Sequence, residues 1–220
     1  MAEVKAAVGL LPTDAAMVID VGAHVGRWTQ ELLERAGERI DSVYAFEPST
    51  TSASKLHERL KPYSGTVEII QAGVSNKSGE AVLFGPCGGS SQASLVQRVT
   101  GEQGKEFERL ETITTVTLDE FTRDRQITTI HFVKMDIEGL EYSALQGAGE
   151  LLREGRIRAL SFEFSHAVVD SRVRFKDYWD LLSECGYRLF RIVPRGRLLP
   201  IASYTPGLEC TGKSNYIAAL

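Results

Sequence analysis

The sequence lacks the features that mark membrane-spanning, exported and disulfide-stabilised proteins. No apolar run approaches the roughly 20 residues that a membrane-spanning helix needs. Residues 1–5 show neither a basic leader nor a long apolar stretch. The three cysteines lie far apart, form no C-x-x-C pair and have no histidine near them at metal-ligand spacing. We therefore expect a cytoplasmic protein without a membrane span, whose thiols are buried or incidental.

The sequence also lacks an excess of positive charge. Its formal net charge of -4 gives no general attraction to a phosphate backbone. Arginines gather at residues 153–158 and 188–197, but most such runs are solvated surfaces. Nucleic acid is therefore not an expected partner.

No linker divides the 220 residues, and 43% hydrophobic and 25% charged residues are ordinary for a globular protein. We expect a single domain over residues 1–220. Apolar strand-like runs alternate with helical patterns, which is typical of an α/β fold: a Rossmann-like, doubly wound, mostly parallel sheet with helices on both faces. The expected strands are 18–21, 43–46, 67–71, 130–135 and 160–164, and the expected helices are 27–35, 51–60, 140–153 and 175–185.

The first expected strand breaks into a glycine turn that is typical of cofactor-binding folds. Asp20 lies at the strand edge, Gly22 and Gly26 follow, and Glu47 ends the second expected strand. In dinucleotide-binding folds, glycines let the backbone approach the cofactor, and an acid about 20 residues later binds ribose hydroxyls. The G-x-G-x-x-G spacing itself is absent. A turn that the glycines merely shape is the alternative, which Asp20 and Glu47 disfavour.

The acid in this turn favours a cationic cofactor. A pyrophosphate binds through the N–H groups and dipole of a helix N-terminus, which the charge of Asp20 would oppose. S-adenosylmethionine instead carries an ammonium and a sulfonium, which a carboxylate attracts. We therefore expect S-adenosylmethionine rather than NAD.

A second charged group follows residues 130–135. If that strand continues through Glu138, then Lys134, Asp136 and Glu138 share one face. Such charges are costly in a buried parallel sheet unless they pair or lie at the carboxyl end, where ligands bind. Repulsion between the acids would raise one pKa and suit a base. A structural pair of Lys134 with one acid, with Glu138 capping the next helix, is the alternative.

Glu163 and His166 lie at the equivalent end of the next expected strand. Histidine suits proton transfer because its unperturbed pKa is near neutrality, so we include both residues in the candidate site. An ordinary surface histidine is the alternative. Nothing in the spacing requires a metal. Asp119 is expected to be a helix N-terminal acid rather than a catalyst.

Two stretches depart from the strand–helix alternation. Residues 81–117 contain a short strand at 81–84, followed by turn-forming and charged residues, and we expect a mobile loop near the cofactor; a simple flexible insertion is the alternative. The β-prone runs 187–192 and 216–220 predict an antiparallel hairpin at one sheet edge. An exposed edge strand there can pair with a second copy of the chain, so a homodimer stays an open alternative.

With these residues in place, the chain resembles the FkbM family of S-adenosylmethionine-dependent methyltransferases, class I in fold. The resemblance runs from residue 18 to about 164, with a weaker match at 214–218. Its pieces are residues 19–26, 45–48, 116–121 and 134–141, the last followed by 145–148. The last piece is the most specific, because a D-x-E-G-x-E run that leads into L-x-G-A is hard to obtain by accident.

The resemblance implies that the turn residues hold the methionine part of the cofactor, that Glu47 holds the ribose, and that residues 72–74 lie along the adenine. Whether His24 contacts the cofactor or the acceptor stays open. The predicted cofactor-binding residues are Asp20, Gly22, Ala23, His24, Gly26, Glu47, Pro48, Ala72, Gly73, Val74 and Asp136.

The expected activity is methyl transfer to a hydroxyl of a small molecule, sugar or secondary metabolite. Asp136, Glu138 or His166 is the expected base, and Glu163 orients a partner. An NAD-dependent oxidoreductase is disfavoured by the glycine spacing and Asp20. A non-catalytic cofactor-binding subunit would not need Asp136, Glu138 and His166, so their presence disfavours that alternative. Protein or RNA methylation stays open, because loops choose the acceptor.

Overall fold

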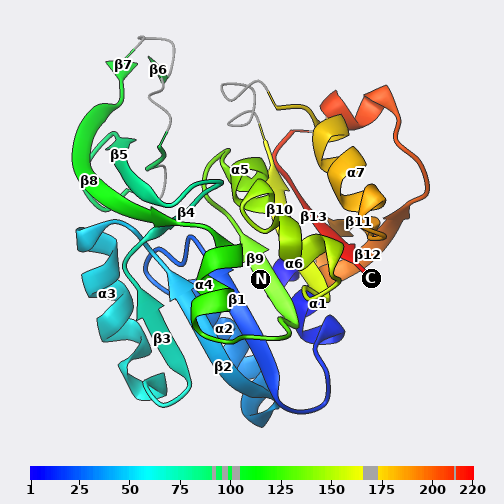
Figure 1. Cartoon of the computed structure of the whole chain (residues 1–220), viewed down its shortest axis with the longest axis horizontal. Coiled ribbons are helices and arrows are strands. Elements are labelled where there is room, and N and C mark those ends of the chain that lie inside the picture. Colours follow the sequence, from blue (N-terminus) through cyan, green and yellow to red (C-terminus); the bar gives the residue numbers. More distant parts are fainter. Residues whose placement is uncertain (91–92, 96–98, 101–104, 166–172, 211) are drawn as a thin grey trace.

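The fold is built on a mixed eight-stranded sheet with the order β12-β11-β13-β10-β9-β1-β2-β3 (Figure 1). The computed structural model describes every residue except 91–92, 96–98, 101–104, 166–172 and 211. The parallel strands are β1 (Ala16–Val21), β2 (Ile40–Phe46), β3 (Val67–Ile70), β9 (Phe132–Met135) and β10 (Ala159–Phe164). They correspond to the five apolar runs in the sequence, which confirms the mostly parallel α/β fold.

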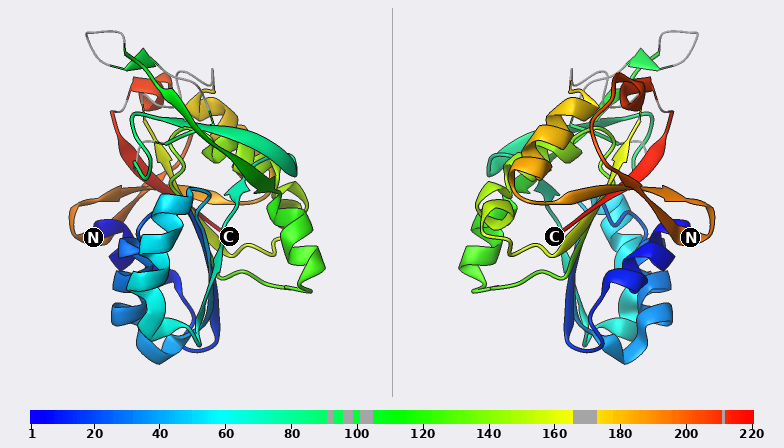
Figure 2. Two further views of the ribbon diagram at one scale, coloured as in Figure 1. Left: turned by 90° about the vertical axis from the view of Figure 1, so that its left-hand side faces the viewer. Right: turned by 90° about the vertical axis from the view of Figure 1, so that its right-hand side faces the viewer.

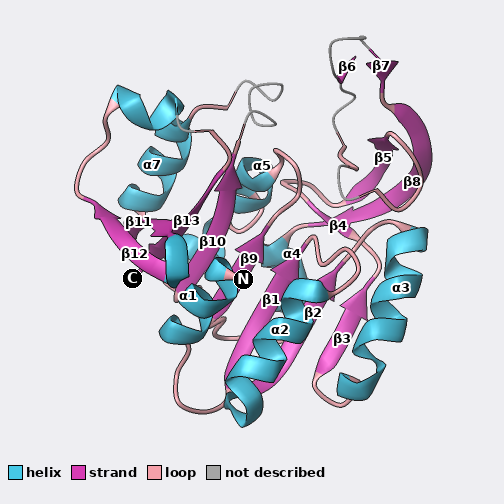
Figure 3. Cartoon of the chain, turned by 180° about the vertical axis from the view of Figure 1, so that it is seen from behind, coloured by secondary structure: helices cyan, strands magenta, loops and turns pink. Residues whose placement is uncertain are grey.

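Helices cover both faces of this sheet (Figures 1 and 3). One face carries α1 (Ala2–Leu10), α2 (Arg27–Ala36) and α3 (Thr50–Leu60), and the other carries α4 (Leu118–Asp124), α5 (Glu141–Gln146), α6 (Gly149–Arg153) and α7 (Phe175–Glu184). Short 3-10 turns are η1 (Gly37–Arg39), η2 (Lys61–Tyr63), η4 (Pro194–Gly196) and η5 (Pro206–Cys210). Because side chains alternate along a strand, β1 packs Val18 against α1 and α2 and Ile19 against the opposite layer. No helix in the described part of the chain is long and apolar enough to cross a membrane.

The C-terminal part forms the predicted antiparallel edge, with one strand more than expected. β11 (Arg188–Val193) pairs with β13 (Ser214–Ala219), as the two β-prone runs predict, and β13 also pairs with β10. The outermost strand is β12 (Arg197–Ile201), in a segment expected to be a connection. This strand contains Pro200, and proline is tolerated at a sheet edge because the missing N–H faces away from the ladder.

Within residues 81–117, the short strand predicted at 81–84 is confirmed, but much of the expected mobile loop that follows forms strands as well. β5 (Gly79–Gly85) pairs with β8 (Glu108–Val116), and β4 (Gly73–Val74) completes a three-stranded sheet. β6 (Val99–Thr100) pairs with β7 (Lys105–Glu106). In β8, buried Ile113 and Thr115 alternate with exposed Thr112 and Thr114, so the polar residues form the outer face of a strand. Residues 91–92, 96–98 and 101–104 of the expected loop lie outside the described residues.

The three-stranded sheet lies beyond the end of the large sheet toward which the parallel strands point (Figure 2). Thr50, at the start of α3, donates a hydrogen bond from its Oγ1 to Glu111 of β8 at 2.8 Å. The small sheet is therefore joined to the helix that follows β2, next to the edge where ligands of parallel sheets bind.

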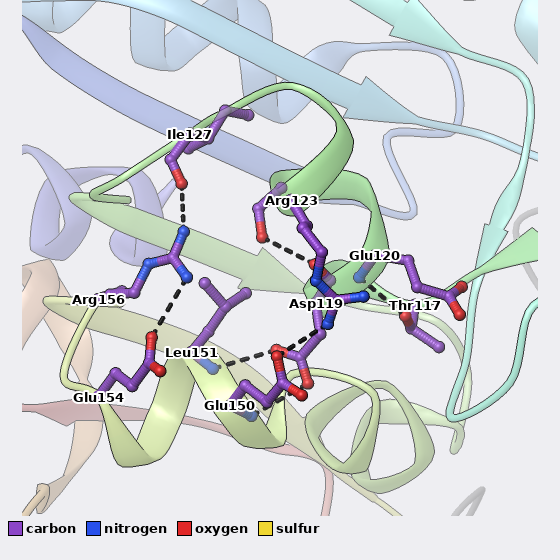
Figure 4. Close-up of polar contacts among 10 residues, drawn as sticks. Thr117, Asp119, Glu120, Arg123, Ile127, Glu150, Leu151, Glu154 and Arg156 are labelled. Carbon is purple, nitrogen blue, oxygen red and sulfur yellow. Dashed lines mark hydrogen bonds and ion pairs between the residues drawn. The ribbon is translucent and has the colours of Figure 1, made fainter.

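The single helix predicted over residues 140–153 is wrong, because α5 and α6 divide that stretch. The chain turns at Gly147, whose carbonyl oxygen accepts the N–H of Asp119 at 3.0 Å. The Asp119 carboxylate in turn accepts the N–H groups of Glu150 and Leu151, at 3.0 Å each (Figure 4). Asp119 lies in the first turn of α4, as predicted, and it also caps the start of α6.

Gly147 is required at this break by close packing. A Cβ atom at Gly147 would lie 2.1 Å from the Ser75 carbonyl oxygen, whereas one at Gly9, an exposed residue of α1, would meet nothing within 4 Å. We expect Gly147→Ala to lower the free energy of unfolding by about 1–3 kcal/mol, because backbone must move. Gly9→Ala is the control and should raise it by about 0.5–1 kcal/mol, because alanine favours a helix. Urea denaturation measures both, and equal effects of the two substitutions would contradict this packing.

Candidate functional site

A cavity opens at the carboxyl ends of β1, β2 and β9, under the three-stranded sheet. Its walls come from the turn after β1, the end of β2, the residues around β4, the segment after β5 and the turn after β9. The lining residues are Val21, Gly22, His24, Phe46, Glu47, Pro48, Ala72, Gly73, Val74, Leu83, Ser90, Ala93, Ser94, Leu95, Ile113, Asp136, Ile137, Glu138 and Leu140. The cavity therefore combines an apolar wall with three carboxylates.

The glycine turn brings two strand ends into contact. Gly22 has a φ of +81°, and a Cβ atom there would lie 2.2 Å from the carbonyl oxygen of Asp136. Its N–H donates to the Phe46 carbonyl at 3.0 Å. Only glycine meets both the left-handed backbone and this close approach, so the turns after β1 and β9 share one wall of the cavity.

Glu47 is held at the end of β2 by two backbone donors. The N–H of His24 reaches its Oε2 at 2.8 Å, and the N–H of Ser49 reaches its Oε1 at 2.9 Å. The residue is 7% exposed, and burial raises the pKa of its carboxyl, while the two N–H donors oppose that shift. Each oxygen retains acceptor capacity, so this group can bind hydroxyls that enter the cavity.

Asp20 lies behind the cavity rather than on its wall. It is fully buried, accepts a hydrogen bond from Thr29 Oγ1, and pairs with Lys134, with 3.0 Å between Nζ and Oδ1. Lys134 Nζ also donates to the Gly22 carbonyl at 2.8 Å and lies 3.9 Å from Asp136 Oδ2. Although burial alone would lower it, the pKa of Lys134 is raised, first by Asp20 and then by Asp136. The Lys134 ammonium thus stays charged, and its hydrogen bond to the Gly22 carbonyl fixes the turn after β1.

The remaining turn residues lie differently with respect to the cavity. Gly26 lets α3 pack closely against the turn, because a Cβ atom there would lie 2.7 Å from Leu56 Cδ1. Ala23 is buried and does not line the cavity. His24 is on the wall, with a φ of +51° and its Nε2 3.1 Å from the Gly89 carbonyl. His24 therefore connects the turn after β1 with the segment after β5.

The strand β9 ends at Met135. The prediction that Lys134, Asp136 and Glu138 share one face of a strand required this strand to continue through Glu138, and it does not. Glu138 lies in the following turn with a φ of +55°, and Gly139 follows with +91°. Asp136 and Glu138 nevertheless both line the cavity. The turn, rather than strand periodicity, brings these two acids to the same site.

Glu163 is not among the residues that line the cavity with these acids. Glu163 is 6% exposed on β10 and pairs with Lys213, with 2.7 Å between Oε2 and Nζ. His166 lies outside the described residues. Burial alone would lower the pKa of Lys213, but Glu163, Asp136 and Glu138 raise it. Lys213 therefore interacts electrostatically with all three acids.

Two parts of the site were missed from the sequence. Leu83 and Ile113 form an apolar wall from the small sheet, and the alternation of β8 was the available signal. Lys213 lies in a loop without any pattern that points to the acids. Among the described residues, no three His, Cys, Asp or Glu side chains are grouped so that they could hold a metal.

Comparison with known proteins identifies a family model that covers most of the chain. The model described as a methyltransferase FkbM domain matches residues 20–189. The hexuronic acid methyltransferase AglP of Haloferax volcanii is 29% identical over 165 residues, which cover 75% of this chain and 60% of that protein. The chain thus spans about 60% of the length of this curated relative.

Solved structures share the fold at low identity. The methyltransferase FkbM of Methylobacillus flagellatus has a TM-score of 0.58 at 19% identity, and the match covers 95% of this chain and 45% of that one. A Streptococcus pneumoniae protein in complex with S-adenosyl-L-methionine has a TM-score of 0.50 at 12% identity, with coverage of 98% and 71%. At these identities the likeness concerns the fold alone.

The buried pair beneath the cavity makes a prediction about stability. Lys134→Met leaves Asp20 as an unpaired buried charge and should lower the free energy of unfolding by about 3–5 kcal/mol. Adding Asp20→Asn removes that charge, so the double variant should lose less than Lys134→Met alone. Lys176→Met is the control, since Lys176 pairs with Asp180 on the solvent side of α7, and this half-exposed pair should contribute about 0–1 kcal/mol. Urea denaturation of the four proteins tests this, and a Lys134→Met loss as small as that of the control would refute it.

Proposed function

The chain belongs to the FkbM methyltransferase family, and on this premise we propose that it methylates a hydroxyl group of a sugar-like acceptor with S-adenosylmethionine as the donor. The observation that carries the proposal is the buried Glu47 carboxylate on the cavity wall, at the carboxyl end of β2 and beside the glycine turn. In parallel sheets this is the position from which an acid binds ribose hydroxyls. The hexuronic acid named for the Haloferax relative supports a sugar as acceptor.

The chemistry of the cavity wall fits the three parts of this cofactor. Glu47 offers acceptors for ribose hydroxyls, and Leu83 and Ile113 offer an apolar wall for adenine near Val74. Asp136, whose side chain is 44% exposed, offers a negative charge for the cationic methionine end. Asp136 thus takes the electrostatic part that the sequence assigned to Asp20, whose charge is compensated by Lys134.

When bound, S-adenosylmethionine supplies a methyl group that its sulfonium already activates. The protein's task is to orient the acceptor hydroxyl in line and to accept its proton. Asp136 and Glu138 both line the cavity and are the candidates for that proton acceptor. Glu163, held by Lys213, is the orienting acid at the same edge of the sheet. His166 stays a predicted base.

The cofactor assignment predicts a specific effect of Glu47. Calorimetric titration should show saturable binding of S-adenosylhomocysteine and no binding of NAD. Glu47→Ala should weaken S-adenosylhomocysteine binding about 10- to 100-fold, because hydrogen bonds to a charged group are worth about 1.5–3 kcal/mol. The affinity of Glu47→Gln, which keeps one acceptor oxygen, should lie between that of the wild type and that of Glu47→Ala.

Glu68→Ala provides the matched control, since Glu68 is an exposed acid on the neighbouring strand β3 and pairs with Arg125. Its affinity should equal that of the wild type, and circular dichroism checks that all variants are folded. Binding of NAD alone, or wild-type affinity in a folded Glu47→Ala variant, would overturn the cofactor assignment.

The acid assignment predicts a loss of turnover. With a panel of hydroxylated sugars that includes uronic acids, Asp136→Asn and Glu138→Gln are assayed by formation of S-adenosylhomocysteine. The variant that removes the base should lose about 10²- to 10⁴-fold in turnover. Glu138→Gln should keep its affinity for S-adenosylhomocysteine, and Glu154→Gln, at the exposed end of α6, should keep full turnover. Wild-type turnover in both cavity variants would reject these acids as the base.

A further inference from the structure

The turn after β9 carries the two candidate acids in a strained conformation. Residues 136–140 connect β9 to α5, and four of them line the cavity. Glu138 has a φ of +55°, which is uncommon for a residue with a side chain and persists only where the surroundings hold it. The conformation of the turn therefore depends on contacts from outside it.

Glu141, the first residue of α5, makes the contact that closes this turn. Its Oε1 accepts the backbone N–H of Ile137 at 2.8 Å, across the base of the turn. Ser94 Oγ donates to the Glu138 carbonyl at 3.2 Å on the opposite side. The Glu141 hydrogen bond comes from the protein core, whereas the Ser94 bond comes from the segment that covers the cavity.

The burial of Glu141 is unusual for an acid. The residue is 1% exposed, and its Oε2 has no hydrogen-bond partner. Burial raises the pKa of its carboxyl to about 8. A buried acid without a cationic partner destabilises a fold compared with an apolar residue of similar size, so packing does not explain the residue at this position.

We propose that Glu141 is a positioning residue of the methyl-transfer site, whose buried carboxyl holds the turn 136–140 and thereby sets the place of Asp136 and Glu138 at the cavity. The catalytic part of this inference rests on the proposed function. The geometric part does not, because it concerns a hydrogen bond inside the protein. Glu141 is not among the residues that line the cavity, so it acts through the turn alone.

The protonation of Glu141 gives the inference a second signature. Between pH 4.5, its ordinary value, and pH 8, the folded chain retains a proton that the unfolded chain releases. The contribution of this group to folding therefore becomes less favourable as the pH rises through that window. The titratable groups that interact with it are Asp136, Glu163 and Tyr178, and substitution of Glu141 leaves all three in place.

The test compares Glu141→Gln, which keeps an acceptor oxygen, with Glu141→Leu, which fills the same space without one. Glu141→Leu should release the Ile137 amide, so that its hydrogen exchange becomes at least about tenfold faster. Its kcat should fall about 10- to 100-fold, because misplaced groups lose reactivity, and its affinity for S-adenosylhomocysteine should fall less than its kcat, because Glu47 still offers its carboxylate to the ribose. Glu141→Gln should restore both readouts and make the fall in stability between pH 5 and 8 less steep, with Glu3 and Glu47 still contributing to it.

Glu34→Leu, an exposed acid on α2, is the control and should change neither readout. Unchanged exchange at Ile137 in folded Glu141→Leu would overturn the inference, as would a Gln variant that loses as much kcat as the Leu variant. If the wild type itself turns over no acceptor, the proposed function fails, and the exchange experiment alone decides the role of Glu141.

Discussion

A buried ion pair between Asp20 and Lys134 holds the centre of the sheet and the floor of the cavity. The two residues lie opposite each other on β1 and β9, and Ser161 of β10 lies opposite Lys134 on the same face. Ser161 in turn donates a hydrogen bond to Glu3 of α1 at 2.7 Å. This polar row crosses three central strands whose other residues are apolar, apart from Glu163 near the end of β10. It is tolerated because each charge has a partner, whereas either charge alone would be costly in this layer.

Lys134 also links the buried ion pair to the two turns that line the cavity. Its hydrogen bond to the Gly22 carbonyl fixes the turn after β1, and the close contact of Gly22 with Asp136 passes that position on to the turn after β9. Glu47 is held separately, by backbone donors. The acids of the cavity thus have their positions set by the protein before any ligand enters, which is the preorganisation that the proposed methyl transfer requires.

The parallel strands could be predicted because each is an apolar run of strand length, and the end of β2 then led directly to Glu47. The partner of Asp20 could not be identified, since Lys134 is distant in sequence and register decides their meeting. Local chemistry also misled: the polar residues of β8 resemble a loop, and the break at Gly147 depends on Asp119 from another helix. Glu138 joined the site through a left-handed turn that strand periodicity does not describe.

We propose that the cavity between the ends of β1, β2 and β9 binds the methyl donor, with Glu47 at its ribose. The decisive measurement is a crystal structure of the chain with S-adenosylhomocysteine. We expect ribose hydroxyls within hydrogen-bonding distance of the Glu47 carboxylate and adenine against Leu83 and Ile113. Ligand bound elsewhere, or bound in this cavity with Glu47 left without a contact to it, would contradict this placement of the donor.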